Sequence, residues 1–397
     1  MGSKRVPEVR FKGFSGEWEE KKLRELASFA KGNGYSKSDL IEEGEPIILY
    51  GRLYTKYQTV IEEVDTFTKM KEKSIISKGY EVIVPSSGET SEDISRASVV
   101  KRSGVILGGD LNVIYPSDEI NSIFLALTIS NGNQQKELRK KAQGKSVVHL
   151  HNSELKEVNL YYPKKEEQSR IGNFFKQLDE TIAIQQQELD TLKQTKQGFL
   201  QKMFPKEGES VPEIRFPGFG GEWEGYNLGK IVEVTMGQSP KGENYTKNPH
   251  DNILVQGNAD IKNGWVVPRL WTTQITKVAN KGDIILSVRA PVGDVGKTQY
   301  DVVIGRGVAA IKGNEFIYQL LLKMKVDDFW KKFSTGSTFE SINSTDIKEA
   351  MIRVPNELEQ NKIGDFLKRL DETIALHEHE LDILKQTKKA FLQKMFV

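Results

Sequence analysis

The 397-residue chain contains one unit twice, and this duplication constrains its fold more than any other feature. The segment VPEVRFKGFSGEWE at 6–19 returns as VPEIRFPGFGGEWE at 211–224. The segments 171–204 and 363–396 are also alike, with identical residues at 24 of 34 aligned positions. The first pair is offset by 205 residues (211 − 6) and the second by 192 (363 − 171), while the sequences between them share almost nothing. The pattern predicts two similar frames that carry dissimilar inserts.

The repeated segments 171–204 and 363–396 have the spacing of long helices with one narrow apolar stripe. Their apolar residues follow alternating steps of four and three, which is the period of a coiled coil. An acidic first turn follows Pro163 and Pro355, and we expect each helix to run about 38 residues, or roughly 57 Å. The stripe comprises Ile171, Phe175, Leu178, Ile182, Leu189, Leu192, Phe199 and Met203 in the first copy, and Ile363, Leu367, Leu370, Ile374, Leu381, Leu384, Phe391 and Met395 in the second.

Two narrow stripes are most simply buried by pairing the helices with each other as an antiparallel coiled coil. Gln185 and Lys196 interrupt the first stripe, and His377 and Lys388 interrupt the second. We expect Gln185 to lie opposite Lys388 and Lys196 to lie opposite His377. Such polar residues either fix the register of the pair or are tolerated in a wet seam.

The inserts mix short β-type runs, turn residues and a few helical stretches, which indicates an α/β (α+β) fold with a pseudo-two-fold internal repeat. We expect helical runs at 123–142 and 316–333. The predicted strands are 46–50, 98–102, 111–116, 252–257, 282–288 and 307–313. The domains predicted from this pattern are a first globular domain at 1–163, a spacer helix at 164–204, a linker with a second globular domain at 205–355, and a second spacer helix at 356–397.

Composition excludes several classes of protein. Cysteine is absent, so disulfides and thiolate chemistry are excluded, and the net charge of +2 requires any nucleic-acid surface to arise from local segregation of charge. No apolar run approaches the length of a membrane span, and we expect a cytoplasmic protein without a membrane partner.

No catalytic motif stands out in the sequence. The GKS at 144–146 resembles a phosphate-binding loop, but Arg139 stands where that loop requires glycine. The GRG at 305–307 lacks the third glycine of a dinucleotide fingerprint, and the five histidines form no convincing ligand set. We therefore expect a chain that is not an enzyme and holds neither a metal nor a cofactor.

A weaker similarity at the offset of 192 aligns LRKKAQGKS at 138–146 with WKKFSTGST at 330–338. A basic helix end followed by a glycine turn with hydroxyls offers cations, N–H groups and hydroxyl donors to phosphate oxygens. The same residues also suit an ordinary helix C-terminus. The candidate phosphate contacts are Lys140, Lys145, Ser146, Lys332, Ser337 and Thr338.

Several spaced motifs together resemble the specificity subunits of type I restriction–modification enzymes. The opening PEVRFKGF and PEIRFPGF segments with GEW match that family, as does the closing P-x-x-x-EQ-x-x-IG-x-F ahead of each long helix. The segments KGDIILSVRAPVG at 281–293 and GQSP at 237–240 also look like motifs of that family. The similarity extends over essentially the whole chain.

The resemblance implies that each insert is a target-recognition domain for one half of a bipartite, asymmetric site in double-stranded DNA. The paired helices would set the distance between half-sites and dock two methyltransferase subunits, and motor-endonuclease subunits would join them. S-adenosylmethionine, ATP and Mg²⁺ would be bound by those partners, and this chain would carry no cofactor. Two alternatives are a coiled-coil scaffold whose inserts bind proteins and a stand-alone nuclease.

Base reading favours arginine for guanine, and asparagine or glutamine for adenine, with aromatic and threonine side chains against thymine methyl groups. In the first insert, the run 49–57 provides the candidates Tyr50, Arg52, Tyr54, Thr55, Lys56 and Tyr57, although a half-buried strand would explain the same pattern. In the second insert, the candidates in turns are Gln238, Ser239, Lys241, Gln256, Asn258 and Arg289. We expect Arg52→Ala to weaken binding selectively at first-half bases, and Lys140→Ala to weaken it on all sequences.

Overall fold

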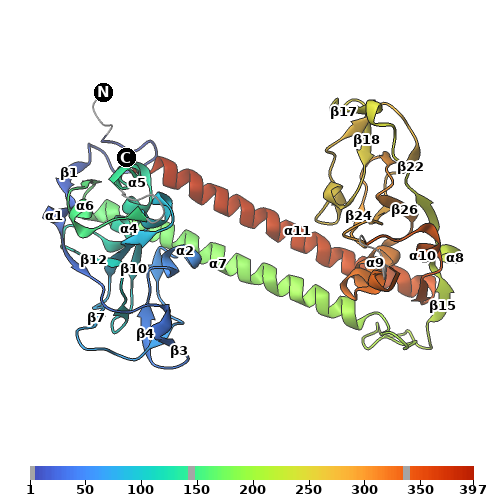
Figure 1. The fold of residues 1–397 in the computed structure, drawn as a ribbon, viewed down its shortest axis with the longest axis horizontal. Coiled ribbons are helices and arrows are strands. Elements are labelled where there is room, and N and C mark those ends of the chain that lie inside the picture. Colours follow the sequence, from blue (N-terminus) through green and yellow to red (C-terminus); the bar gives the residue numbers. More distant parts are fainter. Residues whose placement is uncertain (1–4, 142–147, 334–339) are drawn as a thin grey trace. The chain divides into compact units, whose positions relative to one another are not determined.

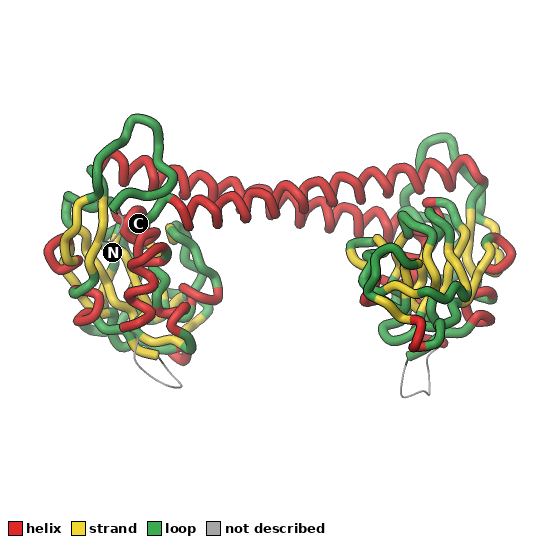
Figure 2. The backbone as a smooth tube through the Cα atoms, turned by 90° about the horizontal axis from the view of Figure 1, so that it is seen from above, coloured by secondary structure: helices red, strands yellow, loops and turns green. Residues whose placement is uncertain are grey.

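The protein is described by a computed structural model, which covers residues 5–141, 148–333 and 340–397. Its residues form two compact units, unit 1 from residues 1–186 with 379–397 and unit 2 from residues 187–378. Each unit combines strands with helices (Figure 2), so the predicted α/β class is confirmed. The predicted domain limits near 163, 204 and 355 remain predictions.

Unit 1 is built around two five-stranded sheets. Helix α4 (Ser122–Ser130) packs against the first of these sheets, and α5 (Gly132–Lys141) packs against α4 (Figure 1). The first sheet has the order β2 (Ala27–Lys31), β12 (Leu111–Pro116), β8 (Glu81–Pro85), β10 (Ser98–Val100) and β5 (Val60–Ile61). The second has the order β3 (Leu40–Ile41), β6 (Phe67–Thr68), β4 (Glu45–Ile48), β11 (Ile106–Leu107) and β7 (Ile75–Ile76). The remaining short elements are α1 (Leu23–Leu26), α2 (Arg52–Thr55), α3 (Ser91–Ile94), α6 (Asn152–Lys156), η1 (Lys37–Asp39), β9 (Ser87–Gly88) and β13 (Val148–His149).

Unit 2 repeats this arrangement with its own strands. One sheet has the order β16 (Glu233–Met236), β26 (Val308–Lys312), β23 (Ile284–Ser287), β24 (Val295–Lys297), β20 (Trp265–Val266) and β19 (Ile261–Lys262). The other has the order β17 (Tyr245–Thr246), β21 (Trp271–Thr272), β18 (Asn252–Val255), β25 (Val302–Ile304) and β22 (Lys277–Ala279). The helices and helical turns are α8 (Leu228–Ile231), α9 (Glu315–Val326), α10 (Ser344–Lys348), η2 (Gly242–Asn244), η3 (Asn258–Asp260) and η4 (Phe329–Phe333).

The inserts therefore share a topology although their sequences do not. In the second sheet of each unit, the first, third and second strands along the chain lie next to one another in that order, followed by two later strands. All six predicted strand segments contain a strand, and each is apolar on the face that packs into a core, for example Ile47 and Ile48 in β4. Burial of alternating or continuous apolar runs explains why strand positions were predictable.

The predicted helical runs are each interrupted. In the run at 123–142, α4 ends at Ser130 and α5 begins at Gly132, because Asn131 has an extended backbone and Gly132 has a φ of +70°. The run at 316–333 ends α9 at Val326, and Asp328 has a φ of +54° before η4 begins. Left-handed backbone at these residues breaks the helical hydrogen-bond series, so each predicted helical run is present as two helical segments.

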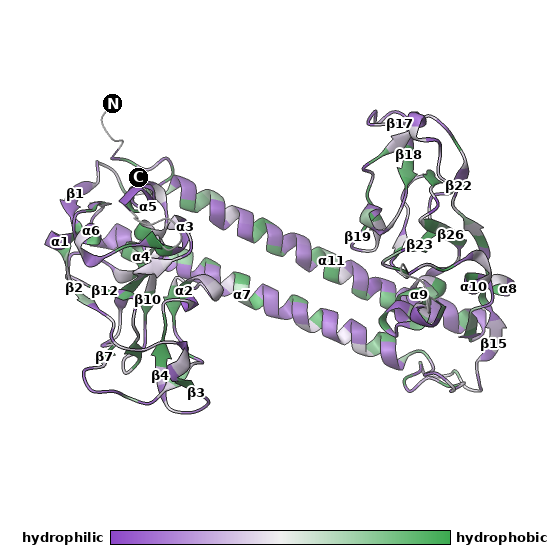
Figure 3. Cartoon of the chain, in the orientation of Figure 1, coloured by the Kyte–Doolittle hydropathy of each residue, from purple (hydrophilic) through white to green (hydrophobic). Residues whose placement is uncertain are grey.

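The repeated segments form the two long helices as predicted, α7 (Lys165–Lys202) and α11 (Glu357–Lys394), each of 38 residues. Figure 3 shows both helices as mainly hydrophilic, with hydrophobic residues recurring along their length. Every predicted stripe position is buried or half-buried. The division between the units falls inside both helices, so each unit contains a part of each helix.

Within each unit the two helical parts pack antiparallel, as expected. In unit 1 the Phe174 and Phe391 rings lie 5.2 Å apart, and the Lys385 ammonium donates to the Gln186 amide oxygen at 3.2 Å. In unit 2 the Phe199 and Phe366 rings lie 5.0 Å apart. Partner numbers fall along α11 as they rise along α7, which is the order of antiparallel helices.

The stripe lysines find partners that we did not predict. Lys388 pairs with Asp179, and Lys196 pairs with Asp371 at 2.5 Å. The facing of Lys388 with Gln185 and of Lys196 with His377 stays a prediction. The same aspartates also accept hydrogen bonds from the inserts, Asp179 from Thr59 and Asp371 from Gln319. Each aspartate therefore joins both helical parts of its unit to the insert, and the repeat preserves this three-way contact.

The opening motif of each frame ties the ends of the two helices together. The Arg10 guanidinium donates to both Glu167 carboxylate oxygens at 2.6 and 2.7 Å, and also to the Gly16 carbonyl at 2.6 Å. The neighbouring Val9 N–H donates to the Lys394 carbonyl at the end of α11. We call this set the frame clasp of unit 1.

The frame clasp of unit 2 has the same geometry. Arg215 donates to both Glu359 oxygens at 2.7 Å and to the Gly221 carbonyl at 2.6 Å. The Ile214 N–H donates to the Lys202 carbonyl at the end of α7. The glutamates are almost fully buried, at 2% and 0% side-chain exposure, so the paired charge is largely removed from water.

The glutamine after each clasp glutamate anchors the insert to the frame. Gln168 donates to the Pro163 carbonyl and accepts from the N–H of Asn121, whose side chain caps α4. Gln360 donates to the Pro355 carbonyl and accepts from Asn314, which caps α9. The motif residues shared by the repeats thus position the insert helices relative to the frame.

Each insert leaves and rejoins the frame through adjacent strands. In unit 1, β1 (Glu19–Lys22) pairs antiparallel with β14 (Asn159–Tyr162). In unit 2, β15 (Glu224–Asn227) pairs antiparallel with β27 (Met351–Val354). Trp18 and Trp223, the tryptophans of the opening motifs, are buried beside these strands at 2% and 1% exposure. Among the residues described, we find no helix with the length and apolarity needed to cross a membrane.

Candidate nucleic-acid interface

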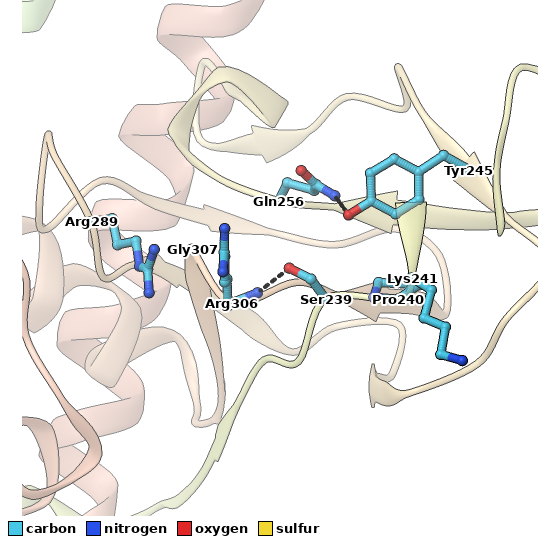
Figure 4. Close-up of a pocket in the computed structure, with 8 residues that line it drawn as sticks. All are labelled: Ser239, Pro240, Lys241, Tyr245, Gln256, Arg289, Arg306 and Gly307. Atoms are coloured by element: carbon cyan, nitrogen blue, oxygen red, sulfur yellow. Dashed lines mark hydrogen bonds between the residues drawn. The ribbon is translucent and has the colours of Figure 1, made fainter. Parts of the chain in front are cut away.

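A polar pocket on unit 2 gathers residues from five separate parts of the chain. It has a volume of about 530 Å³ and lies where the segment after β16, η2 and β17, the end of β18, the segment after β23, and the β25–β26 turn meet. Figure 4 shows the lining side chains. They are Ser239, Pro240, Lys241, Tyr245, Gln256, Arg289, Arg306 and Gly307.

Glycines bring the backbone segments under this pocket into contact. A Cβ on Gly237 would lie 2.1 Å from the Gly305 carbonyl oxygen, and a Cβ on Gly307 would lie 2.0 Å from that of Gln256. Both distances are impossible for a larger residue, so glycine is required where these segments approach. The turn between Gly305 and Gly307 consequently places Arg306 on the rim of the pocket.

Hydrogen bonds orient the polar groups of the pocket. The Gln256 Nε2 donates one of its two N–H groups to the Tyr245 hydroxyl at 2.6 Å, which orients the amide and turns Oε1 away from that contact. The Arg306 backbone N–H donates to Ser239 Oγ at 3.2 Å. Figure 4 shows both bonds, with Lys241 extending away from the other labelled side chains.

The charge of the pocket is positive. Lys241, Arg289 and Arg306 are exposed, and none of the described residues that line the pocket is acidic. Local segregation of charge thus appears in a chain whose net charge is only +2. Such a surface attracts an anionic polymer while its polar groups supply specific hydrogen bonds.

The sequence candidates of the second insert mostly converge here. Ser239, Lys241, Gln256 and Arg289 line the pocket, although they are spread over about fifty residues of sequence. Asn258 lines a different cavity of unit 2, together with Trp265 and Lys297, and Gln238 is exposed beside the pocket. Sequence reasoning missed Tyr245 and Arg306. The paired glycines around Arg306 were the available signal, but we read them only as an incomplete dinucleotide fingerprint.

Several side chains of the first insert that were candidates for base contacts are packed or hydrogen-bonded within unit 1. Tyr50 packs beside a core cluster and its ring lies 5.9 Å from that of Tyr54. Tyr57 donates to the Ala97 carbonyl at 3.3 Å, and burial raises the pKa of its hydroxyl. Thr55 and Lys56 are exposed, and the segment forms the helical turn α2, with Leu53 buried beneath it.

Arg52 is engaged inside unit 1. Its guanidinium donates to Asp65 at 2.6 Å, to the Gln58 amide oxygen at 2.9 Å and to the Glu63 carbonyl at 2.9 Å, and the side chain is only 9% exposed. Lys56 also pairs with Asp65, at 2.6 Å. The Lys56 ammonium, followed by Arg52, lowers the pKa of Asp65 to about 2.

The backbone allows the pocket of unit 2 to be compared with the same place in unit 1. In unit 1, the backbone N–H groups of Gly32 and Asn33 donate to the carbonyls of Leu111 and Leu107, respectively. In unit 2, those of Gly237 and Gln238 donate in the same pattern to the carbonyls of Val308 and Ile304. Likewise, the Gly108 N–H donates to the Ile48 carbonyl, as the Gly305 N–H donates to the Val255 carbonyl. The antiparallel backbone pairing of Ser87 with His149 matches that of Arg289 with Ser341. The positions of Gln256, Arg289 and Arg306 therefore correspond to Leu49, Ser87 and Gly109.

The phosphate candidates fall partly outside the described residues. Lys140 is exposed in the last turn of α5, and the Lys332 ammonium lies 3.7 Å from the centre of the Phe329 ring. Lys145, Ser146, Ser337 and Thr338 lie outside the described residues. In the described part of the chain there is no group of three or more histidine, aspartate or glutamate residues arranged to hold a metal ion.

Both units thus define a class of protein in which a constant helical frame carries α/β modules with different surface chemistry. The model of the type I restriction–modification DNA specificity domain matches the chain twice, at 15–194 and 220–386. The chain belongs to this family and carries two copies of its specificity domain, as the resemblance of the motifs predicted. It is a non-catalytic subunit.

Two curated relatives match over nearly their whole length. The putative type I restriction enzyme MjaX specificity subunit of Methanocaldococcus jannaschii is 26% identical over 95% of this chain and 92% of its own. The MjaVIII specificity subunit of the same organism is 19% identical over 99% of this chain and 93% of its own.

Solved structures support the fold. A type I restriction–modification S subunit from M. genitalium shares 16% identity, with 99% of each chain covered and a TM-score of 0.66. A chain from a structure of type I R-M system assembly and conformational transition shares 21% identity, covering 94% of this chain and 96% of that one, with a TM-score of 0.57.

Proposed function

We propose that the chain recognises a bipartite, asymmetric site in double-stranded DNA, with unit 1 reading one half and unit 2 the other. The single observation that carries this proposal is the repetition of one topology with different side chains at corresponding positions. Gln256, Arg289 and Arg306 occupy places that Leu49, Ser87 and Gly109 occupy in unit 1. Two modules of one shape with different polar groups suit two different half-sequences.

The long helices are proposed to set the distance between the half-sites and to dock two methyltransferase subunits, with motor-endonuclease subunits joining the same complex. Those partners would bind S-adenosylmethionine, ATP and Mg²⁺, and the complex would act on cytoplasmic DNA. Supporting this assignment, the residues shared by the repeats serve the frame clasps and insert anchors, whereas the inserts differ. A docking site for two copies of one partner requires a surface that is present twice.

At the residue level, Lys241, Gln256, Arg289 and Ser239 are proposed to contact DNA from unit 2, with Gln238 and Asn258 on adjoining surface. In unit 1, Thr55 and Lys56 are the exposed candidates, with Tyr50, Tyr54 and Tyr57 supporting the turn that carries them. Lys140, Lys145, Ser146, Lys332, Ser337 and Thr338 are proposed phosphate contacts. Replacing Lys140 by alanine should weaken binding on all sequences and reduce the salt slope by about one unit.

The test is to map modified adenines in the genome of a host that carries the complete system, and in the same host lacking this chain. We expect methylation at one two-part motif, with two different half-sequences separated by a fixed spacer, and its loss without the chain. Replacing residues 225–350, which span the insert of unit 2, with the corresponding segment of a relative should change one half-sequence only. A motif that stays the same after this exchange, or that consists of one continuous sequence, would rule the proposal out.

A further inference from the structure

Resting on the proposed function, we propose that Arg306 reads a guanine in the half-site of unit 2, and that Gln256 accepts a hydrogen bond from the amino group of an adjacent adenine or cytosine. The observation behind this proposal is the combination, in one pocket, of an exposed arginine fork with an amide oxygen whose orientation is fixed by a hydrogen bond from the same amide.

The first step concerns the donor and acceptor pattern of the pocket. Phosphate oxygens only accept hydrogen bonds, so a site built for phosphate presents donors alone. Here the hydrogen bond from Gln256 Nε2 to the Tyr245 hydroxyl at 2.6 Å orients the amide and leaves Oε1 as an acceptor in a pocket that Arg289 and Arg306 also line. An acceptor at this place repels a phosphate and matches a base edge that carries both acceptors and an amino group.

The second step concerns the placement of Arg306. Its backbone N–H donates to the Ser239 hydroxyl, and the missing Cβ atoms of the flanking Gly305 and Gly307 allow both glycines to lie against Gln256. A Cβ on Gly305 would lie 3.3 Å from Gln256 Cγ, so the turn that carries Arg306 lies directly against Gln256. Holding the backbone on both sides limits the reach of the guanidinium, and this is what selective base contact requires.

The third step is the choice of base. The guanidinium presents two parallel N–H groups, and guanine O6 and N7 in the major groove are the acceptor pair that fits them. The Gln256 oxygen then accepts from the N6 amino group of adenine or the N4 amino group of cytosine at a neighbouring position. Arg289 and Lys241, the other exposed cations that line the pocket, supply phosphate contacts on either side of this base.

Unit 1 cannot use the same chemistry, because Gly109 and Leu49 stand at the positions of Arg306 and Gln256. The inference therefore predicts an asymmetric effect. Changing Arg306 should relax one position of one half-site and leave the half-site of unit 1 untouched.

The experiment compares four versions of the complete complex, the wild type and the variants Arg306→Ala, Arg306→Lys and Lys277→Ala. Lys277 is an exposed lysine of β22 that lies outside the pocket, so its loss removes one positive charge from the same unit. Adenine methylation is mapped in each host genome, and the purified complexes are titrated against duplexes in which each guanine of the wild-type motif is replaced in turn.

We expect Arg306→Ala to reduce discrimination at one guanine by about 5- to 150-fold, which corresponds to the loss of a bidentate base contact. Arg306→Lys should fail in the same way, because an ammonium lacks the planar fork, and Lys277→Ala should preserve the motif. If genomic methylation disappears in Arg306→Ala, the duplex titrations still measure discrimination.

Two results would overturn the inference. Discrimination in Arg306→Ala that equals the wild type at every guanine shows that Arg306 reads no base. Discrimination retained by Arg306→Lys but lost by Arg306→Ala shows that a single ammonium suffices, so the bidentate fork assigned to Arg306 is wrong. In both cases the wild-type motif remains two-part, so the proposed function survives. A wild-type complex without a two-part motif contradicts the proposed function itself.

Discussion

At the scale of single residues, Arg52 shows how a DNA-type residue can serve the protein instead. Its guanidinium is committed to Asp65, Gln58 and Glu63, and the side chain is nearly buried. We therefore propose that Arg52 orders the α2 turn that presents Thr55 and Lys56, which revises its expected role as a direct base reader. Unit 2 has a different ion pair in the segment after β18, in which Asp260 of η3 accepts from Arg269 at 2.9 Å.

This role predicts that Asp65→Asn reproduces the effect of Arg52→Ala on the first half-site. Both variants should weaken selectivity for the half read by unit 1, because both release the same turn. The duplex titration used for the whole complex measures this effect. Loss of selectivity in Arg52→Ala with an unchanged Asp65→Asn would instead identify Arg52 as a direct reader.

The protonation of Asp65 gives a second readout of the same contact. The pKa of Asp65 is lowered to about 2, chiefly by Lys56, so the ion pair contributes stability above the unfolded pKa of about 3.9. That contribution, about 0–1 kcal/mol for an exposed pair, is lost as the pH falls through the folded value near 2. Carboxyl NMR titration should therefore show a higher midpoint for Asp65 in Lys56→Met, and an unchanged midpoint would contradict this assignment.

At the scale of structural elements, the frame clasps are the contacts that the repeat preserves most faithfully. Glu359→Ala leaves the guanidinium of Arg215 largely buried without its carboxylate, and we expect a loss of about 3–5 kcal/mol in the free energy of unfolding. Glu167→Ala should have a similar effect in unit 1, because the distances are repeated there within 0.1 Å. Urea unfolding followed by tryptophan fluorescence measures both.

The matched control removes both partners of one clasp. In Arg215→Met with Glu359→Leu no charge is left buried alone, so the double variant should be more stable than Glu359→Ala. A double variant that is no more stable than the single one would show that the hydrogen bond to Gly221, or packing, dominates the clasp.

At the scale of the whole molecule, α7 and α11 each have residues in both units, and the proposed function predicts that their length sets the spacing between half-sites. Lys385 donates to Gln186, which identifies facing positions in unit 1. Inserting seven residues after Gln186 and seven before Lys385 adds two turns to each helix and preserves the apolar stripe. The added length is about 10 Å, equivalent to roughly three base pairs.

We expect this variant to methylate a motif with both half-sequences unchanged and a longer spacer, as measured by genome-wide mapping of modified adenines. An insertion of three residues in α7 alone is the control, because it rotates the stripe away from its partner and should lower thermal stability. A seven-residue variant that is folded and active on the original spacer would refute the role of the helices in spacing.

The sequence was most informative where a local period decides the structure. The bounds of α7 and α11 followed from a repeating stripe, and the predicted strands followed from apolar runs. Contacts between distant residues left no local trace. The Arg10–Glu167 pair joins residues 157 positions apart in the sequence. The hydrogen-bond partners of Arg52 could not be predicted, because they meet it only when the segment after α2 folds back onto the turn. Arg306 was missed for the same reason, since its chemistry depends on Gln256 and Tyr245 beside it in space.

The pairing of β1 with β14, and of β15 with β27, has a consequence for how such genes diversify. The two ends of an insert lie on neighbouring, paired strands. A coding segment bounded by these strands can therefore be exchanged between related genes without changing the distance between the points where the frame leaves and resumes. The helix repeats, identical at 24 of 34 positions, lie on either side of the insert of unit 2 and offer sites for homologous crossover there. A new target sequence can thus arise in one recombination event that exchanges a whole insert. Stepwise mutation would instead pass through inserts in which only some of the base-contacting residues have changed.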